Sequence, residues 1–422
     1  MMTSTFSRIT QFVRSPRFPI FMIVFVDVLG LGITIPVLPL FAKNTLHAQA
    51  WQITALTSVY FTAQFFASPV LGRLSDRFGR RPVLILSQAG TLLALLMTVV
   101  APVTAFLFIA RAIDGLTGGN ISVAQAYLSD ITDEKNRARG LGLVNASFGL
   151  GFVFGPAFGS VAAAYFGPRV PFFIAACVSF LTILLSIYLL PESLPAERRR
   201  SEHEARVLQA RRSGLSLLRV PAVALLLFIA FGSQVGFFNF QTVFVLWLER
   251  LVFPGRPDTF VQQAVGAILT FVGLCAIATQ FWLIGPAVKR FGEKKLAIGG
   301  NLARGVGFAI MAAAPSVFVV ALGVPFIAIG GGFVLPAMVA LITYAAPPGE
   351  RGQAVGLFQS ASALGSIAGP LLAGFLFQVI NPNAPLIAAA ISMGFTVLVG
   401  SYIFRLPLRQ SIPEKVPAQA PT

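Results

Sequence analysis

Long apolar stretches separated by short polar connections run along almost the whole chain. A helix needs about 20 apolar residues to cross a bilayer core of about 30 Å, and the pattern holds two successive sets of six such stretches. We therefore expect an all-α polytopic membrane protein with twelve transmembrane helices. The predicted spans are 18–41, 51–71, 82–101, 104–128, 141–166 and 171–190, followed by 220–248, 262–285, 296–313, 316–345, 354–379 and 385–405.

Composition supports the same interpretation. Of the 422 residues, 56% are hydrophobic and only 11% are charged, whereas soluble domains carry about 25% charged residues. The net charge of +16 could suggest nucleic-acid binding, but most Lys and Arg residues fall in connections on one side of the predicted spans. This is the positive-inside signal that orients membrane helices, so no nucleic-acid partner is expected. The exceptions are Lys43, Arg169, Arg250 and Arg256 on the opposite side, and Arg111 and Arg304 within spans.

One long polar segment, 191–219, separates the two sets of spans. Its mixture of arginines and glutamates indicates a cytoplasmic linker that lies on the membrane surface. We therefore predict an N-terminal six-helix half at 1–190, a C-terminal half at 220–410 and a disordered tail at 411–422. With six spans in each half, both termini fall on the cytoplasmic side.

The two halves repeat each other. Arg137, Gly142, Gly151, Gly155-Pro156 and Pro171 recur in the second half at one constant offset, and Gly72, Arg77-Phe78 and Gly79 recur at an almost identical offset. Repeats of this kind are typical of transporters built from two parallel six-helix halves, with a substrate site between them. The copies are Arg351, Gly356, Gly365, Gly369-Pro370 and Pro385 in the first set, and Gly285, Arg290-Phe291 and Gly292 in the second.

The short loop between the second and third spans holds glycines, one acid and four arginines. Such a loop could simply set topology through its positive charge, but the ordered mixture closely resembles the signature loop of the major facilitator superfamily. That resemblance implies a conformational latch between helices. The second-half copy carries Lys289 in place of Asp76, so the latch is expected to be asymmetric. The candidate latch residues are Gly72, Asp76, Arg77, Gly79, Arg80 and Arg81.

The first and fifth spans carry glycine and proline patterns. Glycines spaced by four residues let helices approach closely, and each of them alone is also explained by packing. Together with Pro36 and Pro39 in the first span, the pattern resembles the signatures of drug:proton antiporters with twelve spans, and the fifth-span motif implies export. The last glycine of that motif is replaced by Ser160. Its matching residues are Gly151, Gly155, Pro156 and Gly159.

Four charged residues lie inside predicted spans: Asp27, Arg111, Asp114 and Arg304. A charge in the bilayer interior costs at least about 2.5–3.5 kcal/mol, so each is a candidate for function. Arg111 and Asp114 are spaced to pair on one helical face, and they could be a static pair that holds the fold. We expect that face to continue as a polar stripe through Gly118, Ser122 and Gln125 along one helix.

Asp27 has no basic residue within one turn of its own helix. A carboxyl group held away from water favours its protonated form, and a nearby cation favours the charged form. We therefore predict that Asp27 carries protons and that Arg111 and Asp114 modulate its proton affinity. The resemblance to the exporters supports Arg111, because the fourth helix of that family carries an arginine followed by a glycine, here Gly115.

Sparse polar groups on otherwise apolar spans are candidates for contact with substrate. Aromatic side chains near them could supply apolar walls, as suits a drug-sized ligand. Arg304 could bind an anionic group or be structurally paired. The candidate substrate-binding residues are Tyr60, Gln64, Gln125, Gln234, Gln241, Arg304 and Gln359.

Within the exporters, the chain is most similar to the tetracycline-efflux and multidrug-efflux branch. The departures bear on substrate. Tetracycline exporters carry an acid, a histidine and an acid where this chain has Ala94, Ala276 and Arg304, which argues against tetracycline as the main substrate. The likeness rests on Asp27, Gly30, Gly32 and Pro36 to Pro39, on Ser75 to Leu84, on Ala126 to Asp133 and on Pro191-Glu192-Ser193.

These observations favour a secondary transporter that exports small, largely apolar compounds in exchange for protons. A facilitator or importer of sugars, organic acids or siderophores with the same fold is the alternative, because fold alone does not decide function. An enzyme is not expected: no phosphate-binding GxxxxGK[ST] loop occurs, and His47 and His203 are isolated, so neither a cofactor nor a metal is predicted. We expect a multi-pass monomer surrounded by lipid in a bacterial inner membrane.

Overall fold

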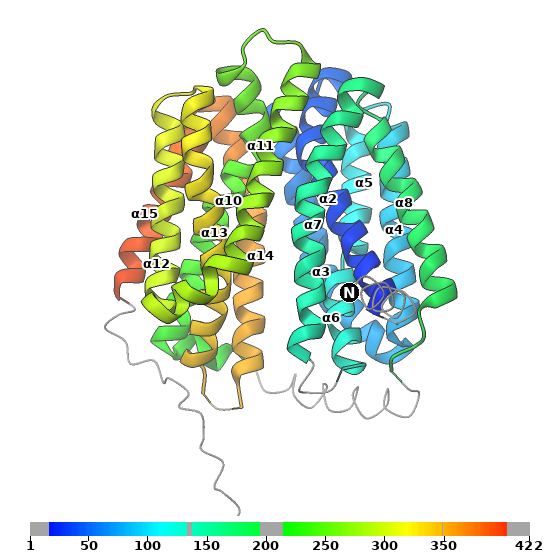
Figure 1. Cartoon of the computed structure of the whole chain (residues 1–422), viewed down its shortest axis with the longest axis vertical. Coiled ribbons are helices and arrows are strands. Elements are labelled where there is room, and N and C mark those ends of the chain that lie inside the picture. Colours follow the sequence, from blue (N-terminus) through cyan, green and yellow to red (C-terminus); the bar gives the residue numbers. More distant parts are fainter. Residues whose placement is uncertain (1–16, 133–136, 195–213, 348, 403–422) are drawn as a thin grey trace, which may run out of the picture.

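The computed structural model describes residues 17–132, 137–194, 214–347 and 349–402. These residues form helices and connections, without strands, and the helices run roughly parallel to one another in two groups (Figure 1). The all-α prediction is confirmed. Most of the predicted linker and the whole predicted tail at 411–422 lie outside the described residues.

The described residues of the N-terminal group form seven helices, because one predicted span is broken in two. Each is rich in apolar residues and packs against its neighbours through buried Ile, Leu, Val and Ala side chains. They are α2 (Arg17–Leu46), α3 (Ala50–Phe78), α4 (Arg80–Val100), α5 (Thr104–Thr117), α6 (Asn120–Asp130), α7 (Arg137–Phe166) and α8 (Val170–Leu189).

The C-terminal group begins with a short 3-10 helix, η1 (Gly214–Arg219), and contains three π-helical turns within its long helices. In order along the chain they are α10 (Pro221–Trp247), η2 (Leu248–Val252), α11 (Asp258–Ala278), η3 (Thr279–Leu283), α12 (Ile284–Ala313), α13 (Val317–Ala345), α14 (Arg351–Phe375), η4 (Leu376–Ile380) and α15 (Ala384–Ser401).

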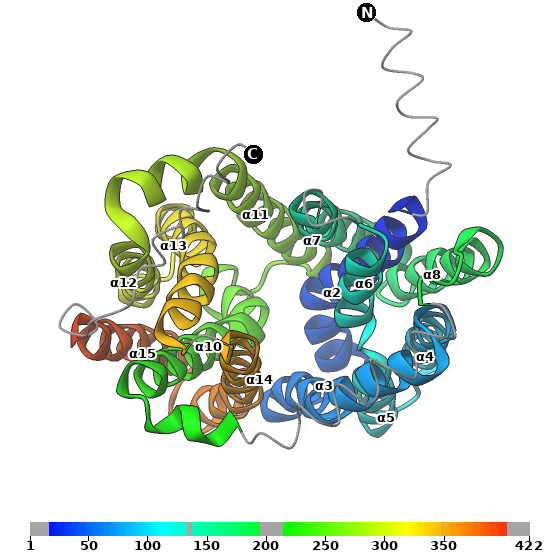
Figure 2. The same ribbon diagram turned by 90° about the horizontal axis from the view of Figure 1, so that it is seen from below.

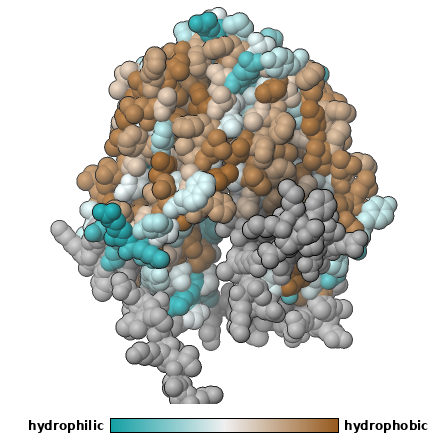
Figure 3. Space-filling view, in the orientation of Figure 1, coloured by the Kyte–Doolittle hydropathy of each residue, from teal (hydrophilic) through white to brown (hydrophobic). Residues whose placement is uncertain are grey.

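Nine described segments are long and apolar enough to cross a membrane, and one of them, Asp258–Ala313, bends at Gly292 and forms two spans. The helix α3 and the pair α5 and α6 complete the twelve predicted spans. Several helices extend past the predicted limits because the charged residues of the short connections are themselves helical. Hydrophobic side chains cover most of the visible face (Figure 3), as expected for a surface in contact with lipid.

The repeat detected in the sequence is visible in the backbone. Gly79 separates α3 from α4 with φ 103° and ψ 160°, and its copy Gly292 bends α12 with φ 74° and ψ 162°. Both residues adopt the positive φ that a side chain disfavours. The same glycine therefore makes the same sharp turn between the second and third helices of each half.

The prediction of one continuous helix over residues 104–128 is wrong. The span ends at Thr117 as α5 and resumes at Asn120 as α6, with Gly118 and Gly119 between them. Two adjacent glycines carry the highest conformational freedom and weaken a helix interior. The break changes which residues of this span share a face.

Two pairs of helices join the halves: α7 packs on α11, and α3 packs on α14 (Figure 2). The polar contacts between the halves lie toward the end opposite η1 and the loop between α3 and α4. Lys43 Nζ is 2.5 Å from Glu249 Oε1, and Asn44 donates a hydrogen bond of 2.8 Å to Asp258. Gln378 donates to Gln49 at 3.1 Å. The described hydrogen bonds and ion pairs between the halves all involve residues 43–58 of the first half, so this end is closed.

Candidate functional site

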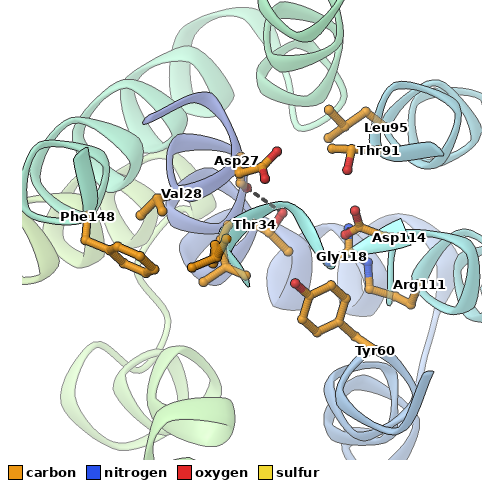
Figure 4. A pocket seen from close by; sticks show the side chains of 13 residues that line it. Asp27, Val28, Thr34, Tyr60, Thr91, Leu95, Arg111, Asp114, Gly118 and Phe148 are labelled. Atoms are coloured by element: carbon orange, nitrogen blue, oxygen red, sulfur yellow. Dashed lines mark hydrogen bonds and ion pairs between the residues drawn. The ribbon is translucent and has the colours of Figure 1, made fainter. Parts of the chain in front are cut away.

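A cavity inside the N-terminal half holds Asp27, Arg111 and Asp114, three of the four charged residues predicted within the spans. Six helices, α2 to α7, contribute to its wall (Figure 4). Asp27 on α2 and Asp114 on α5 face the same space, with Arg111 and Tyr60 beside them. The lining residues are Asp27, Val28, Gly30, Leu31, Thr34, Tyr60, Thr91, Leu95, Arg111, Asp114, Gly118, Ile121 and Phe148.

Arg111 and Asp114 form the predicted ion pair, with 3.1 Å between the guanidinium nitrogen and the carboxylate oxygen. Arg111 is 6% exposed, and its guanidinium carbon lies 5.8 Å from the centre of the Tyr60 ring. Gln64 donates hydrogen bonds to the Tyr60 hydroxyl at 3.2 Å and to the carbonyl of Gly118 at 2.8 Å. Tyr60 and Gln64 therefore belong to the same polar cluster as the ion pair.

Asp27 faces this cavity without an ion pair to any described residue. The buried side chain of Asn120, the first residue of α6, lies near Asp27. Asn120 was not among the residues predicted from the sequence, because a continuous helix would have placed it on another face. The signal was available: a polar residue directly after two glycines in an apolar span marks a helix break.

Of the predicted polar stripe, the part from Arg111 through Asp114 to Gly118 lines the cavity. Beyond the break, Ser122 and Gln125 are exposed and do not line the cavity. Thr91 on α4, which the sequence analysis did not single out, lines the cavity beside Asp114.

The glycines of the fifth-span motif pack against the helix that carries Asp27. A Cβ on Gly151 would stand 3.0 Å from the backbone nitrogen of Leu29. Gly159 similarly meets Ile33, at 3.0 Å from its Cα. These contacts leave no room for a side chain at Gly151 or Gly159, so the motif sets the distance between α7 and α2. The two glycines lie on either side of Pro156, where a bend in α7 is expected.

The loop between α3 and α4 forms a compact ionic cluster. Arg80 is buried, and its guanidinium lies 2.5 Å from Asp76 and 3.1 Å from Asp130. The carboxylate of Glu192, directly after α8, accepts hydrogen bonds from the backbone nitrogens of Arg80 and Arg81 at 2.8 and 3.2 Å. The cluster therefore ties α3, α4, α6 and the end of α8 together.

The arginines of this loop have different surroundings. Asp76 forms an ion pair with Arg80, while Arg77 is exposed and lies over the ring of Phe78 at 5.3 Å. Gly72 has open space around it. Asp130 and Glu192 belong to segments that carried the family resemblance, but no role had been assigned to them.

The remaining candidates for substrate contact do not line this cavity. Gln359 on α14 is exposed, and Gln234 and Gln241 on α10 are partly exposed. Arg304 is buried in α12, in the other half. Of the candidates for substrate contact, Tyr60 and Gln64 therefore lie with the charged residues of the N-terminal half, and the others lie outside this cavity.

A row of aromatic rings connects the two halves. The rings of Tyr60 and Phe61 on α3 are 5.1 Å apart, and Phe61 meets Phe238 of α10 at 4.7 Å. Phe238 contacts Phe237 at 5.3 Å, and Arg304 lies 4.8 Å from the centre of the Phe237 ring. The row therefore extends from the N-terminal charged cluster to the buried arginine of the C-terminal half.

Comparison with known proteins gives a consistent result. The family model described as "Major Facilitator Superfamily" matches residues 20–255 and 257–421. The chain is 34% identical over 349 residues to the class C tetracycline resistance protein of Escherichia coli, covering 82% of this chain and 85% of the relative. It is 30% identical over 383 residues to multidrug resistance protein 2 of Bacillus subtilis, with 89% and 91% covered.

Solved structures resemble the fold. The nucleoside transporter NupG superposes with a TM-score of 0.74 at 16% identity, covering 93% of this chain and 98% of that protein. A peptide transporter POT superposes with a TM-score of 0.71 at 14% identity, covering 92% and 93%. At these identities the likeness shows the arrangement of helices alone.

Proposed function

Because the chain belongs to the major facilitator superfamily, we propose that it exports small, largely apolar compounds in exchange for protons, with Asp27 as the proton carrier. The chain is a multi-pass membrane transporter and not an enzyme. Its relatives of 30–34% identity are named for resistance to tetracycline and to multiple drugs. A membrane transporter that confers resistance to a compound acting inside the cell moves it outward, which supports export over import.

The observation that carries the proton assignment is the contrast between two carboxylates in one cavity. Asp114 is paired with Arg111, whereas Asp27 has the side chain of Asn120 near it and forms no ion pair with a described residue. A carboxyl group in the membrane interior without a paired cation accepts a proton readily, and it becomes charged when water reaches it. Asp27 can therefore bind a proton on one side of the membrane and release it on the other.

Alternating access would couple this proton to export. We place the closed end, with Lys43 and Glu249, on the outer side of the inner membrane and both termini on the cytoplasmic side, because the positively charged connections fall at the end opposite Lys43. Rocking of the two halves would break the outer contacts and expose Asp27 to external protons. The twelve spans form one bundle with the cavity inside it, so we propose that the protein functions as a monomer in lipid.

The test uses inside-out vesicles with an acidified lumen and a pH-sensitive dye. Lipophilic cations, neutral drugs and anionic drugs are added in turn to wild type and to Asp27→Asn. Wild type is expected to release protons when a substrate is added, and Asp27→Asn is expected to give no release. Glu350→Gln, which alters an acid at the start of α14, serves as the control. Proton release by Asp27→Asn at the wild-type rate would refute the assignment.

A further inference from the structure

Arg304 is a buried cation in the C-terminal half for which the described residues supply no anion. It is 4% exposed and lies in the middle of α12, where α13 packs so closely that a Cβ on Gly330 would stand 3.1 Å from its Cγ. None of the ion pairs between described residues includes Arg304, and its Nε has no hydrogen-bond partner among them.

The neighbouring helices could not provide a partner. The helices α13 and α15 pack on α12, and side chains of α10 contact it through Ser233, Phe237 and Phe240. None of these three helices contains an aspartate or glutamate. The acid of α12 itself, Glu293, is eleven residues away, about 16 Å along a helix. A structural ion pair, which the sequence alone leaves open, is therefore excluded within these helices.

A buried charge without a partner lowers the stability of the fold, so its presence points to a ligand. The ring of Phe237 at 4.8 Å covers one side of the guanidinium, but a cation–π contact offsets only part of the cost of burial.

The internal repeat gives an independent reason to regard this position as a binding site. The offset along the chain from Thr91 to Arg304 equals the offset that relates the equivalent turns at Gly79 and Gly292. Thr91 lines the N-terminal cavity beside Asp114. Arg304 therefore occupies, in the second half, the position that faces the charged cavity in the first half.

We infer that Arg304, with the ring of Phe237 over one side of its guanidinium, binds the anionic group of an aromatic substrate. A guanidinium recognises carboxylates through paired hydrogen bonds. The row from Phe237 through Phe238 to Phe61 offers ring faces to the apolar body of the same molecule. The inference rests on the proposed function and adds the class of substrate: flat, largely apolar acids.

The two halves then divide the chemistry. The N-terminal cavity holds two carboxylates and one guanidinium, whereas the interior of the described C-terminal spans holds Arg304 alone. Protons are handled at Asp27, and the anion is bound at the far end of the aromatic row. The substrate and the proton therefore occupy separate sites, and the rocking of the halves couples them.

The test measures binding of naphthalene-2-carboxylate and naphthalene-2-carboxamide to the purified full chain in nanodiscs, with empty nanodiscs subtracted. The two probes have the same shape and differ in charge. Wild type is expected to bind the carboxylate at least tenfold more tightly. Arg304→Gln is expected to abolish this preference with less than a twofold change for the carboxamide, and Arg304→Lys is expected to keep part of it. The matched control is Arg256→Gln, which removes an arginine that lies over Phe260 outside the spans.

Thermal stability separates a binding role from a structural one. Removing a cation without a partner is expected to leave the melting temperature of Arg304→Gln equal to or above that of wild type. A lower melting temperature, or a variant that cannot be purified folded, would mean that Arg304 holds the fold and would overturn the inference. Equal binding of the two probes by wild type would overturn it as well.

The proposed function can survive that result. One outcome is that neutral or cationic drugs drive proton release through Asp27 while wild type binds the carboxylate and the carboxamide equally. That outcome would support proton-coupled export and refute the anion site. If no compound releases protons but Arg304 binds the carboxylate, the anion site stands and proton exchange fails.

Discussion

Gly155 of α7 lies so close to Gly32 of α2 that a Cβ on Gly155 would stand 2.7 Å from the Cα of Gly32. Real Cβ atoms do not approach backbone this closely, so the contact requires glycine. Its copy in the second half, Gly369 of α14, would bring a Cβ to 2.7 Å from the carbonyl oxygen of Val235 in α10. Both halves therefore use the same close crossing of their first and fifth helices.

We predict that Gly155→Ala separates α7 from the helix that carries Asp27. The backbone of Gly32 cannot move aside as a flexible side chain can. We therefore expect Gly155→Ala to lower the free energy of unfolding by about 1–3 kcal/mol and to slow proton exchange. Gly394→Ala is the matched control, since that helical glycine has open space around it and alanine favours a helix. Thermal unfolding and the vesicle assay measure both variants. Equal melting temperatures would contradict the packing argument.

The ion pair between Arg111 and Asp114 leads to a second prediction. Arg111→Gln leaves the carboxylate of Asp114 buried without a cation, and breaking such a pair costs about 3–5 kcal/mol. The double variant Arg111→Gln/Asp114→Asn removes both charges and is expected to recover much of that loss. Reversible unfolding in detergent mixtures gives the free energy of unfolding of wild type, of Arg111→Gln, of Asp114→Asn and of the double variant. If the loss of stability in the double variant equals the sum of the losses in the two single variants, the pair does not interact.

The contact between Lys43 and Glu249 predicts a way to lock the transporter. Cysteines at these two positions, in a background with Cys177→Ser and Cys275→Ser, are expected to be joined by a bifunctional, reducible thiol cross-linker that spans the two long side chains they replace and holds the closed end shut. Transport would stop and return after reduction. The gel shift of a chain cleaved between its halves reports the cross-link. Full transport by the cross-linked protein would mean that this end does not open.

Arg80 and Arg77 stand in the same motif but differ in burial. Because Arg80 is buried between Asp76 and Asp130, Arg80→Gln removes the cation that both carboxylates contact. We expect it to lower the transport rate at least tenfold. Arg77→Gln changes an exposed side chain and is expected to change the transport rate less than twofold. Equal effects in the vesicle assay would favour a general role of positive charge over the specific cluster.

Much of the fold follows from the linear pattern. Apolar stretches of membrane length predict the twelve spans, since a span must satisfy its backbone hydrogen bonds within a helix. The motifs that recur at a nearly constant offset predict two equivalent halves. The spacing of Arg111 and Asp114 also predicts their ion pair, because residues three apart on a helix share a face.

The candidate site depended more on tertiary structure. The span breaks at Gly118 and Gly119, and beyond the break Gln125 does not line the cavity whereas Asn120 lies near Asp27. Two glycines permit a break but do not require one, so their effect depends on the helices packed around them. For the same reason, the sequence could not show that Arg80 is the buried arginine that pairs with Asp76 and that Arg77 is exposed.

By itself, the sequence determined that this chain is a membrane transporter with charges inside its spans, because the cost of placing a charge in lipid restricts where charges occur. The spacing along one helix already predicted the pair of Arg111 with Asp114. Only the tertiary structure decided whether the other two charges meet a partner, and it left Asp27 and Arg304 without ion pairs among the described residues. Whether a charge meets a partner from another helix depends on how closely the helices pack, and no pattern along one helix encodes that distance.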